Sequence, residues 1–181
     1  VRSSLNNNPG TIVTQESDSM EAVVVRGVAL DKNQAKVTLV GVPDQPGMAA
    51  RVFSTLAGAS INIDMIVQNI SHGSATPATD LSFTVDKPEL VKAQKVIDEL
   101  QSKVKFAEVI ADEDIAKVSV VGVGMRTHSG VAANVFETLG EHGINIEMIS
   151  TSEIKISVVV EGKVGEEATR VLHTRFFDKA T

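Results

Sequence analysis

Cysteine, tryptophan and tyrosine are absent from the 181 residues, and six phenylalanines are the only aromatic residues. Without cysteine there is neither a disulfide framework nor thiolate chemistry, so we expect a reducing compartment, the cytoplasm. No apolar run reaches the roughly 20 residues that a bilayer span requires, and the N-terminus lacks a signal-peptide pattern. The formal net charge of −6 comes without a basic stripe, which argues against binding to nucleic acid or to a membrane surface.

Residue patterns that carry catalysis are also missing. The four histidines lie far apart in the sequence, and none forms a ligand-spaced pair for a metal. There is no G-x-S-x-G nucleophile elbow. The glycines from Gly122 to Gly130 lack the G-x-G-x-x-G spacing of a nucleotide-binding loop. We therefore predict no catalytic residue, no metal site and no cofactor, and a free-standing enzyme ranks last among the hypotheses.

An internal duplication organises the chain. The string AKVTLVGV, from Ala35 to Val42, returns as AKVSVVGV from Ala116 to Val123. The longer string GMAARVFSTLAGASINIDMI begins at Gly47, and its counterpart GVAANVFETLGEHGINIEMI begins at Gly130. The loops between the two strings differ in length by two residues. The chain therefore contains two copies of one structural unit.

Each copy predicts the same local elements. Val37 to Val42 is short, β-branched and bounded by glycine and proline, which indicates a buried strand. The next apolar residues recur at i, i+3, i+4 and i+7 from Ala49 to Leu56, one face of an amphipathic helix. A second strand follows over 61–70. The second copy repeats the helix face and places its strand over 144–150.

The first copy continues with a further strand, a helix from Pro88 and a strand over 106–110. This βαββαβ order predicts the ferredoxin-like α+β fold. The second copy ends after a strand over 155–160 and a helix over 166–177, one strand short. A strand-like segment over 22–30 stands before the first copy. We predict that it crosses over to complete the second sheet; the alternative is an edge strand of the first unit.

The predicted organisation has three parts. Residues 1–19 are rich in serine, asparagine, proline, glycine and threonine taken together, and are interpreted as a linker or tail. The first domain covers 35–113. The second combines 20–34 with 114–181, so the first domain is inserted into the second.

Asp44 stands just before the first predicted helix. Free backbone N–H groups at a helix N-terminus favour an anion such as the carboxylate of an amino acid. The Asp44 carboxylate either caps this helix or accepts a hydrogen bond from the ammonium group of a bound amino acid.

Polar residues interrupt the second strand of each copy at equivalent positions: Asn62, Asp64, Asn145 and Glu147. Strand alternation places the first two on one face and Ile61, Ile63 and Met65 on the other. The polar residues either line a binding site or face water. Four consecutive polar residues, 150–153, predict a turn, a bulge or the rim of a site.

These residues belong to segments that resemble the regulatory region of aspartate kinase, which is built from two ACT domains: VPDQPGMAARVF, INIDMIVQN, VSVVGVGMRTHSGVAA and INIEMISTSEIKISV. The resemblance covers Met20 to about Phe177. It implies binding of threonine, with lysine as a candidate second effector, and feedback inhibition of ATP-dependent aspartate phosphorylation. It further implies an ACT–ACT homodimer with effectors at its interface, and a kinase domain or separate alpha subunit as partner. Met20 is well placed for an internal start of translation.

The resemblance also implies which residues bind effectors. In the first repeat they are Asp44, Gly47, Met48, Ala49, Asn62, Ile63, Asp64 and Gln68. In the second repeat, interface contacts and a lysine site would involve Met125, His128, Gly130, Val131, Asn145, Ile146, Glu147 and Ser152. Because the second repeat has no counterpart of Asp44 and carries Thr151 in place of Gln68, we do not expect the two repeats to bind alike.

Two other functions fit the same fold. The chain could be an ACT-type sensor attached to another enzyme of amino-acid metabolism, or a dimerisation unit without a ligand. The string from Ile144 to Val158 favours the aspartate kinase assignment.

Overall fold

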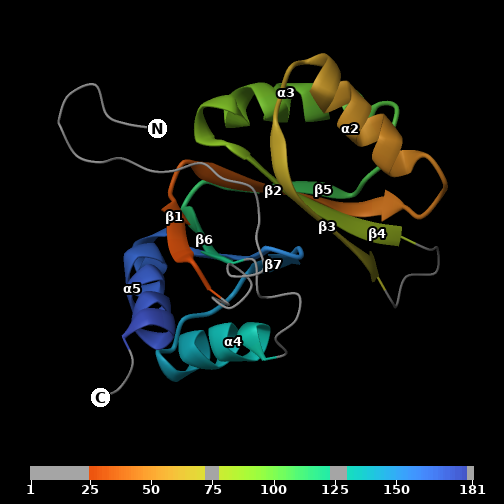
Figure 1. Ribbon diagram of the computed structural model, residues 1–181. Coiled ribbons are helices and arrows are strands. Elements are labelled where there is room, and N and C mark those ends of the chain that lie inside the picture. Colours follow the sequence, from red (N-terminus) through yellow and green to blue (C-terminus); the bar gives the residue numbers. More distant parts are fainter. Residues whose placement is uncertain (1–24, 72–77, 123–129, 179–181) are drawn as a thin grey trace, which may run out of the picture.

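The computed structural model describes residues 25–71, 78–122 and 130–178, which form two four-stranded antiparallel sheets with helices (Figure 1). The first unit contains β2 (Gln34–Pro43), α2 (Met48–Gly58), β3 (Ile63–Ser71), β4 (Ala78–Asp86), the 3-10 turn η1 (Lys87–Glu89), α3 (Leu90–Gln101) and β5 (Glu108–Asp112). The second unit contains β1 (Gly27–Asp31), β6 (Ile115–Val121), α4 (Val131–Glu141), β7 (Met148–Thr151), β8 (Lys155–Glu161), the 3-10 turn η3 (Gly162–Val164) and α5 (Gly165–Phe177).

The order of strands confirms the predicted fold class, two ferredoxin-like units of which the N-terminal strand completes the second. The sheets have the orders β3-β4-β2-β5 and β7-β8-β6-β1, so β1 takes the place in the second unit that β5 has in the first. β1 pairs with β6 in antiparallel register, from Gly27 opposite Val121 to Asp31 opposite Lys117. The alternative, an edge strand of the first unit, is therefore wrong. Residues 22–24 of the predicted strand lie outside the described residues.

The chain passes between the units at two equivalent turns, which we call the crossing turns. One leads from β1 to β2 and the other from β5 to β6. In the first, the Asn33 N–H donates to Asp31 Oδ1 at 2.9 Å; in the second, the Asp114 N–H donates to Asp112 Oδ1 at 2.9 Å. Aspartate stabilises such tight turns through this local hydrogen bond. Each unit thus receives its last strand from the segment that leads into the other unit.

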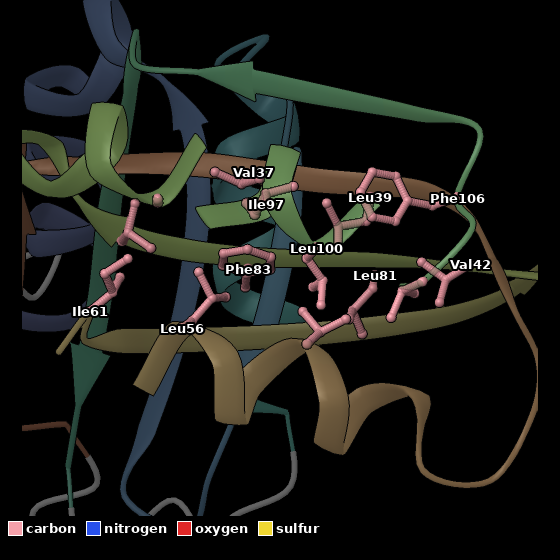
Figure 2. Close-up of a cluster of buried hydrophobic side chains, with 14 of the residues drawn as sticks. Val37, Leu39, Val42, Leu56, Ile61, Leu81, Phe83, Ile97, Leu100 and Phe106 are labelled. Carbon is pink, nitrogen blue, oxygen red and sulfur yellow. The ribbon is translucent and has the colours of Figure 1, made fainter. Parts of the chain in front are cut away.

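Each unit has its own apolar core between its helices and one face of its sheet. In the first core, Phe83 is fully buried and its ring meets that of Phe53 edge-on, with centroids 5.6 Å apart. Figure 2 shows Phe83 among Leu56, Ile97 and other side chains of this core. The second core gathers apolar residues of β6, β8, α4 and α5. The amphipathic periodicity of the helices therefore points to the faces that are buried.

The two sheets face each other with their helix-free sides. α2 and α3 lie on one outer side of the molecule, and α4 and α5 on the other (Figure 1). Between the sheets, Met65 packs with Ile115, Met148 and Val159. None of the described helices has the combination of length and apolar character needed to cross a membrane.

One strand prediction is wrong at Met65. The sequence pattern placed this side chain on the same face as Ile61 and Ile63, but those two pack in or against the first core. Met65 packs between the sheets instead. The register of β3 against β4 shifts between Ile63 and Ile66, and this irregularity reverses the alternation of faces.

Candidate functional site

A cavity of about 220 Å³ lies at the N-terminus of α2, and we call it the α2 cavity. It is lined by Val42, Pro43, Asp44, Gln45, Gly47, Met48, Ala49, Gln68, Thr79 and Leu81. Five of the eight residues predicted for the first-repeat site are among them. Loop, helix and strand residues that are distant in sequence therefore meet at one place.

The start of α2 leaves polar main-chain groups facing this region. Gly47 is the N-cap residue, with φ of 88°, a left-handed conformation that glycine adopts without strain. No side chain caps the helix, so the alternative of Asp44 as the cap is wrong. The Met48 N–H donates to Gln45 O at 3.3 Å, and the Arg51 N–H donates to Gly47 O at 3.0 Å. The amides of Ala49 and Ala50, which lie between them in the first turn, have no intrahelical acceptor. Such amides, together with the helix dipole, attract a carboxylate.

β3 and β4 supply the opposite wall. Gln68 pairs in register with Leu81, which places both at the cavity. Thr79 is 2% exposed, and its hydroxyl donates to Val42 O at 3.5 Å. Thr79, Leu81, Pro43 and Gln45 were not predicted as site residues. Thr79 lies in β4, and because threonine is common in strands, no sequence signal could have marked it.

The other three residues predicted for the first repeat lie away from the α2 cavity. The Asn62 N–H donates to Glu89 Oε2 at 3.2 Å. Ile63 packs against the first core. Asp64 accepts a hydrogen bond from Lys117 Nζ at 2.5 Å and therefore contacts the second unit.

Asp64 belongs to a reciprocal pair of salt bridges between the units. Lys117 of β6 reaches Asp64 of the first unit, and Lys36 of β2 reaches Glu147 of the second. Lys36 and Lys117 occupy the same position in the duplicated AKV string, as Asp64 and Glu147 do in INID and INIE. The side chains of Lys36 and Glu147 are 18% and 23% exposed. The duplicated sequence thus builds the equivalent ion pair twice, once from each unit to the other.

The second-repeat residues are spread over four places. Gly130 is the N-cap of α4, with φ of 99°, and Val131 is buried at its start. Asn145 and Glu147 line a cavity of about 330 Å³ near Gly143 and Lys163. Ile146 lines a separate cavity between the sheets, to which Glu147 also contributes. Ser152 lies in the turn after β7, where its N–H donates to Lys155 O at 2.7 Å. Met125 and His128 lie outside the described residues.

Lys117 also contacts Asp31 of β1, with Nζ 3.2 Å from Oδ2. Burial alone would lower the pKa of Lys117, but its hydrogen bonds and charge interactions with Asp64 and Asp31 outweigh this and raise the pKa above the usual 10.5. Burial would likewise raise the pKa of Asp31. The Asn33 N–H and the Lys117 ammonium overcome that effect and hold the pKa below the usual 3.8. Both shifts stabilise the charged forms. Within the described residues, no group of three or more His, Cys, Asp or Glu side chains is arranged to hold a metal ion.

The Lys117→Met variant is expected to lose about 1 kcal/mol of unfolding free energy at neutral pH, because two carboxylates that are more than one third exposed lose their cation. A lowered carboxylate pKa stabilises the fold above 3.8, and the effect is lost as pH falls through the lowered value. A raised lysine pKa stabilises below 10.5, and the effect is lost as pH rises through the raised value. Urea unfolding across pH should therefore show a wild-type advantage that is full well above 3.8 and shrinks as the pH falls through the lowered pKa of Asp31. An advantage that stays constant throughout this fall in pH would show that packing of the lysine stem, and not its charge, is responsible.

Comparison with known proteins gives one consistent family. A family model described as the ACT domain matches residues 37–101 and 118–176. The aspartate kinase of Pseudomonas fluorescens is 48% identical over 174 residues, which is 96% of this chain and 41% of that protein. The chain thus spans about two fifths of the length of the curated relatives it matches.

Solved structures agree with this result. A crystal structure of aspartokinase alpha and beta subunits contains a chain that is 49% identical, with a TM-score of 0.77, covering 84% of this chain and 98% of that one. The ligand-free regulatory subunit of aspartate kinase from Thermus thermophilus is 41% identical, with a TM-score of 0.78 and coverage of 84% and 99%. E. coli aspartokinase III in complex with lysine and aspartate, in its T-state, is 27% identical, with a TM-score of 0.64 and coverage of 85% and 33%.

Proposed function

Because the chain belongs to the ACT-domain family and to the regulatory part of aspartate kinases, we propose that it binds threonine in the α2 cavity and thereby inhibits the kinase by feedback. One observation carries the proposal: Asp44, Gly47, Met48, Ala49 and Gln68 line a single cavity. The reaction under control is the ATP-dependent phosphorylation of aspartate. Its site lies in the kinase domain or alpha subunit, which is the partner of this chain.

The chemistry of the α2 cavity suits a hydroxyl amino acid. The uncapped amides at the start of α2 bind the carboxylate. Asp44 is exposed at the cavity mouth, where its carboxylate accepts hydrogen bonds from the ammonium group. Gln68 and Thr79 offer an amide and a hydroxyl to the threonine side chain.

A second copy of the chain completes this site in our proposal. At about 220 Å³ the α2 cavity is smaller than the roughly 300 to 1,000 Å³ of most small-molecule pockets. β3 and β7 are edge strands, and the equivalent residues Ile66 and Ile149 on them are 50% and 42% exposed. Exposed apolar residues on an edge strand favour pairing with another chain. An ACT–ACT homodimer along these edges would bury them and close the cavity, with Asn145 and Ile146 of the second repeat as candidate contacts.

Regulation follows as a population shift. Threonine stabilises the dimer arrangement that it binds better, and the kinase is inactive in that arrangement. Lysine is a candidate second effector at the second repeat, which lacks a counterpart of Asp44 and therefore offers different chemistry. The E. coli enzyme solved with lysine in its T-state supports the search for such a site.

Asp44→Ala is expected to weaken threonine binding about tenfold or more, because one charge-assisted hydrogen bond is worth about 1.5 to 3 kcal/mol. Isothermal titration calorimetry measures the affinity, and thermal unfolding without ligand should be unchanged because Asp44 is exposed. Asp98→Ala, which removes an exposed carboxylate from α3, is the matched control. Unchanged affinity in Asp44→Ala would place threonine elsewhere. If no amino acid binds the wild-type chain, the dimerisation unit becomes the better assignment; binding of a different amino acid would favour a sensor of another enzyme.

A further inference from the structure

A groove of about 410 Å³ lies on the outer surface of the first unit, and we call it the α3 groove. It is lined by Val91, Gln94, Lys95 and Asp98 of α3 and by Val109 of β5. Val91 is 62% exposed, and Val109 is half-buried where it packs against the first core. α3 lies on the side of the first sheet that faces away from the second unit (Figure 1). The α3 groove therefore belongs neither to the contact between the units nor to the α2 cavity.

The second unit carries a charged residue at the place of Val91. α3 and α5 align on Ala93 and Ala168, which are both fully buried, so Val91 corresponds to Glu166. The Glu166 carboxylate accepts a hydrogen bond from Lys32 in the first crossing turn. A solvated salt bridge thus suits this position of the fold. Packing within the unit does not require the exposed valine, so Val91 calls for another explanation.

The neighbouring strand β5 adds an unpaired edge. It stands last in the sheet order β3-β4-β2-β5, so its outer side has no partner strand in the described part of the chain. Ile110, on the opposite face of β5 from Val109, is 47% exposed. The equivalent residue of β1 is Ala29, since the two pair with equivalent positions of β2 and β6. Exposed apolar residues on an edge strand favour contact with another protein surface.

Lysines surround the α3 groove. From Lys87 to Lys105, five lysines outnumber three acidic residues, although the whole chain has a formal net charge of −6. Lys92 and Lys95 are exposed on α3 itself. An apolar centre within a polar rim is the usual composition of a protein–protein interface. The α3 groove therefore fits a partner surface on which apolar side chains are bordered by acidic residues.

We infer that the α3 groove is the docking site for the kinase domain or alpha subunit, an inference that rests on the proposed function. The chain spans about two fifths of the length of its curated relatives, and regulation requires that the rest of the enzyme contact one of its surfaces. The helix-free faces of the two sheets cover each other, and the proposed homodimer uses the edges of β3 and β7. One kinase needs one docking site per chain, which agrees with an apolar groove on one of two duplicated units.

This placement connects threonine binding with the kinase. The α2 cavity and the α3 groove belong to the same unit, in which α2 and α3 lie side by side over the first core. When the dimer arrangement changes, the groove and the docked kinase therefore move together with the first unit. Loss of docking should uncouple inhibition from threonine binding.

Cross-linking tests the contact in the complete enzyme, in which this chain is present with its kinase domain or alpha subunit. p-Benzoylphenylalanine replaces Val91 in one variant and Glu166 in the matched control, and mass spectrometry identifies the cross-linked peptides. We expect kinase peptides from position 91 and none above background from position 166. Equal yields, or no kinase peptide from position 91, would overturn the inference. Cross-links from position 91 to a second copy of this chain alone would make the groove a contact between copies and would also overturn it.

Charge-changing variants test the function of the contact. Val91→Asp and Lys95→Glu are expected to raise the threonine concentration for half-maximal inhibition at least about fivefold, the lower end of usual allosteric coupling. Both side chains are exposed, so the variants should fold, as circular dichroism verifies. Arg170→Glu makes the same change at the equivalent position of α5 and should leave inhibition within about twofold of wild type. Unchanged inhibition in Val91→Asp and Lys95→Glu would contradict the docking role.

Calorimetry separates this inference from the proposed function. The threonine affinity of Lys95→Glu should equal that of the wild-type chain, because the α3 groove shares no lining residue with the α2 cavity. A parallel loss of threonine affinity would mean that the variant damages the α2 cavity, which overturns the docking role. If threonine fails to bind the wild-type chain, the proposed function is wrong, whereas the cross-linking result still decides whether the kinase docks in the groove.

Discussion

Phe83→Ala is expected to lower the unfolding free energy of the first unit by about 3 to 5 kcal/mol. Phe83 is fully buried in the centre of the first core, and its ring packs edge-on against Phe53. Truncation removes both the apolar burial and this ring contact, and it leaves a cavity that rigid strands on either side of β4 cannot close.

Urea unfolding monitored by circular dichroism measures this loss. Val91→Ala is the control, because Val91 is apolar but 62% exposed and should change stability by less than about 0.5 kcal/mol. Since each unit has its own core, we also expect the variant to unfold in two steps, with the first unit opening first. A loss below about 1 kcal/mol would mean that the first core repacks around the missing ring.

Gly165→Ala is expected to destabilise the second unit by about 1 to 3 kcal/mol. Gly165 begins α5, and a Cβ atom added there would lie 2.5 Å from the Cβ of Ala116 and 3.2 Å from Cδ1 of Leu30. Ala116 cannot move freely, because it is fully buried in β6. The helix must therefore move away from the sheet.

Two further variants isolate the cause of that loss. Gly140→Ala adds the same methyl group at an exposed position of α4, where a new Cβ would have no neighbouring atom within 4 Å. It should raise the unfolding free energy by about 0.5 to 1 kcal/mol. Ala116→Gly in the Gly165→Ala background removes the clashing methyl group and should recover part of the loss, as a double-mutant cycle by denaturant unfolding would measure. Without any recovery, the cost would come from the backbone of α5 and not from contact with β6.

The duplication allowed much of this fold to be predicted from sequence. Two copies of one pattern gave the elements of each unit, and the missing strand of the second copy pointed to β1. The register shift of β3 against β4 could not be predicted. The alternation in INIDMI is that of a regular strand, and the shift arises only from the pairing with β4. The start of α3 was also misplaced: Pro88 lies in the 3-10 turn η1, and the α-helix begins at Leu90.

The candidate site was partly within reach of sequence reasoning. Asp44 and the residues after Gly47 were marked by the strand–loop–helix pattern, which is local. The salt bridges that Lys36 and Lys117 form between the units could not be predicted, although both copies carry the same AKV string. The packing of the two sheets against each other determines that Glu147 and Asp64 are the partners, and no local sequence pattern predicts that packing.

The crossing turns affect the order in which the two units can fold during synthesis. During synthesis β1 leaves the ribosome before any strand of its own sheet, and β6 follows only after the whole first unit. The first unit can fold as soon as β5 emerges, whereas β1 stays an unpaired strand until β6 is available. Pairing across so long a separation is slow, and an exposed strand invites association with neighbouring nascent chains. A translation product that stops after β5 would contain a folded first unit and an unpaired N-terminal strand, β1, that can associate with other chains.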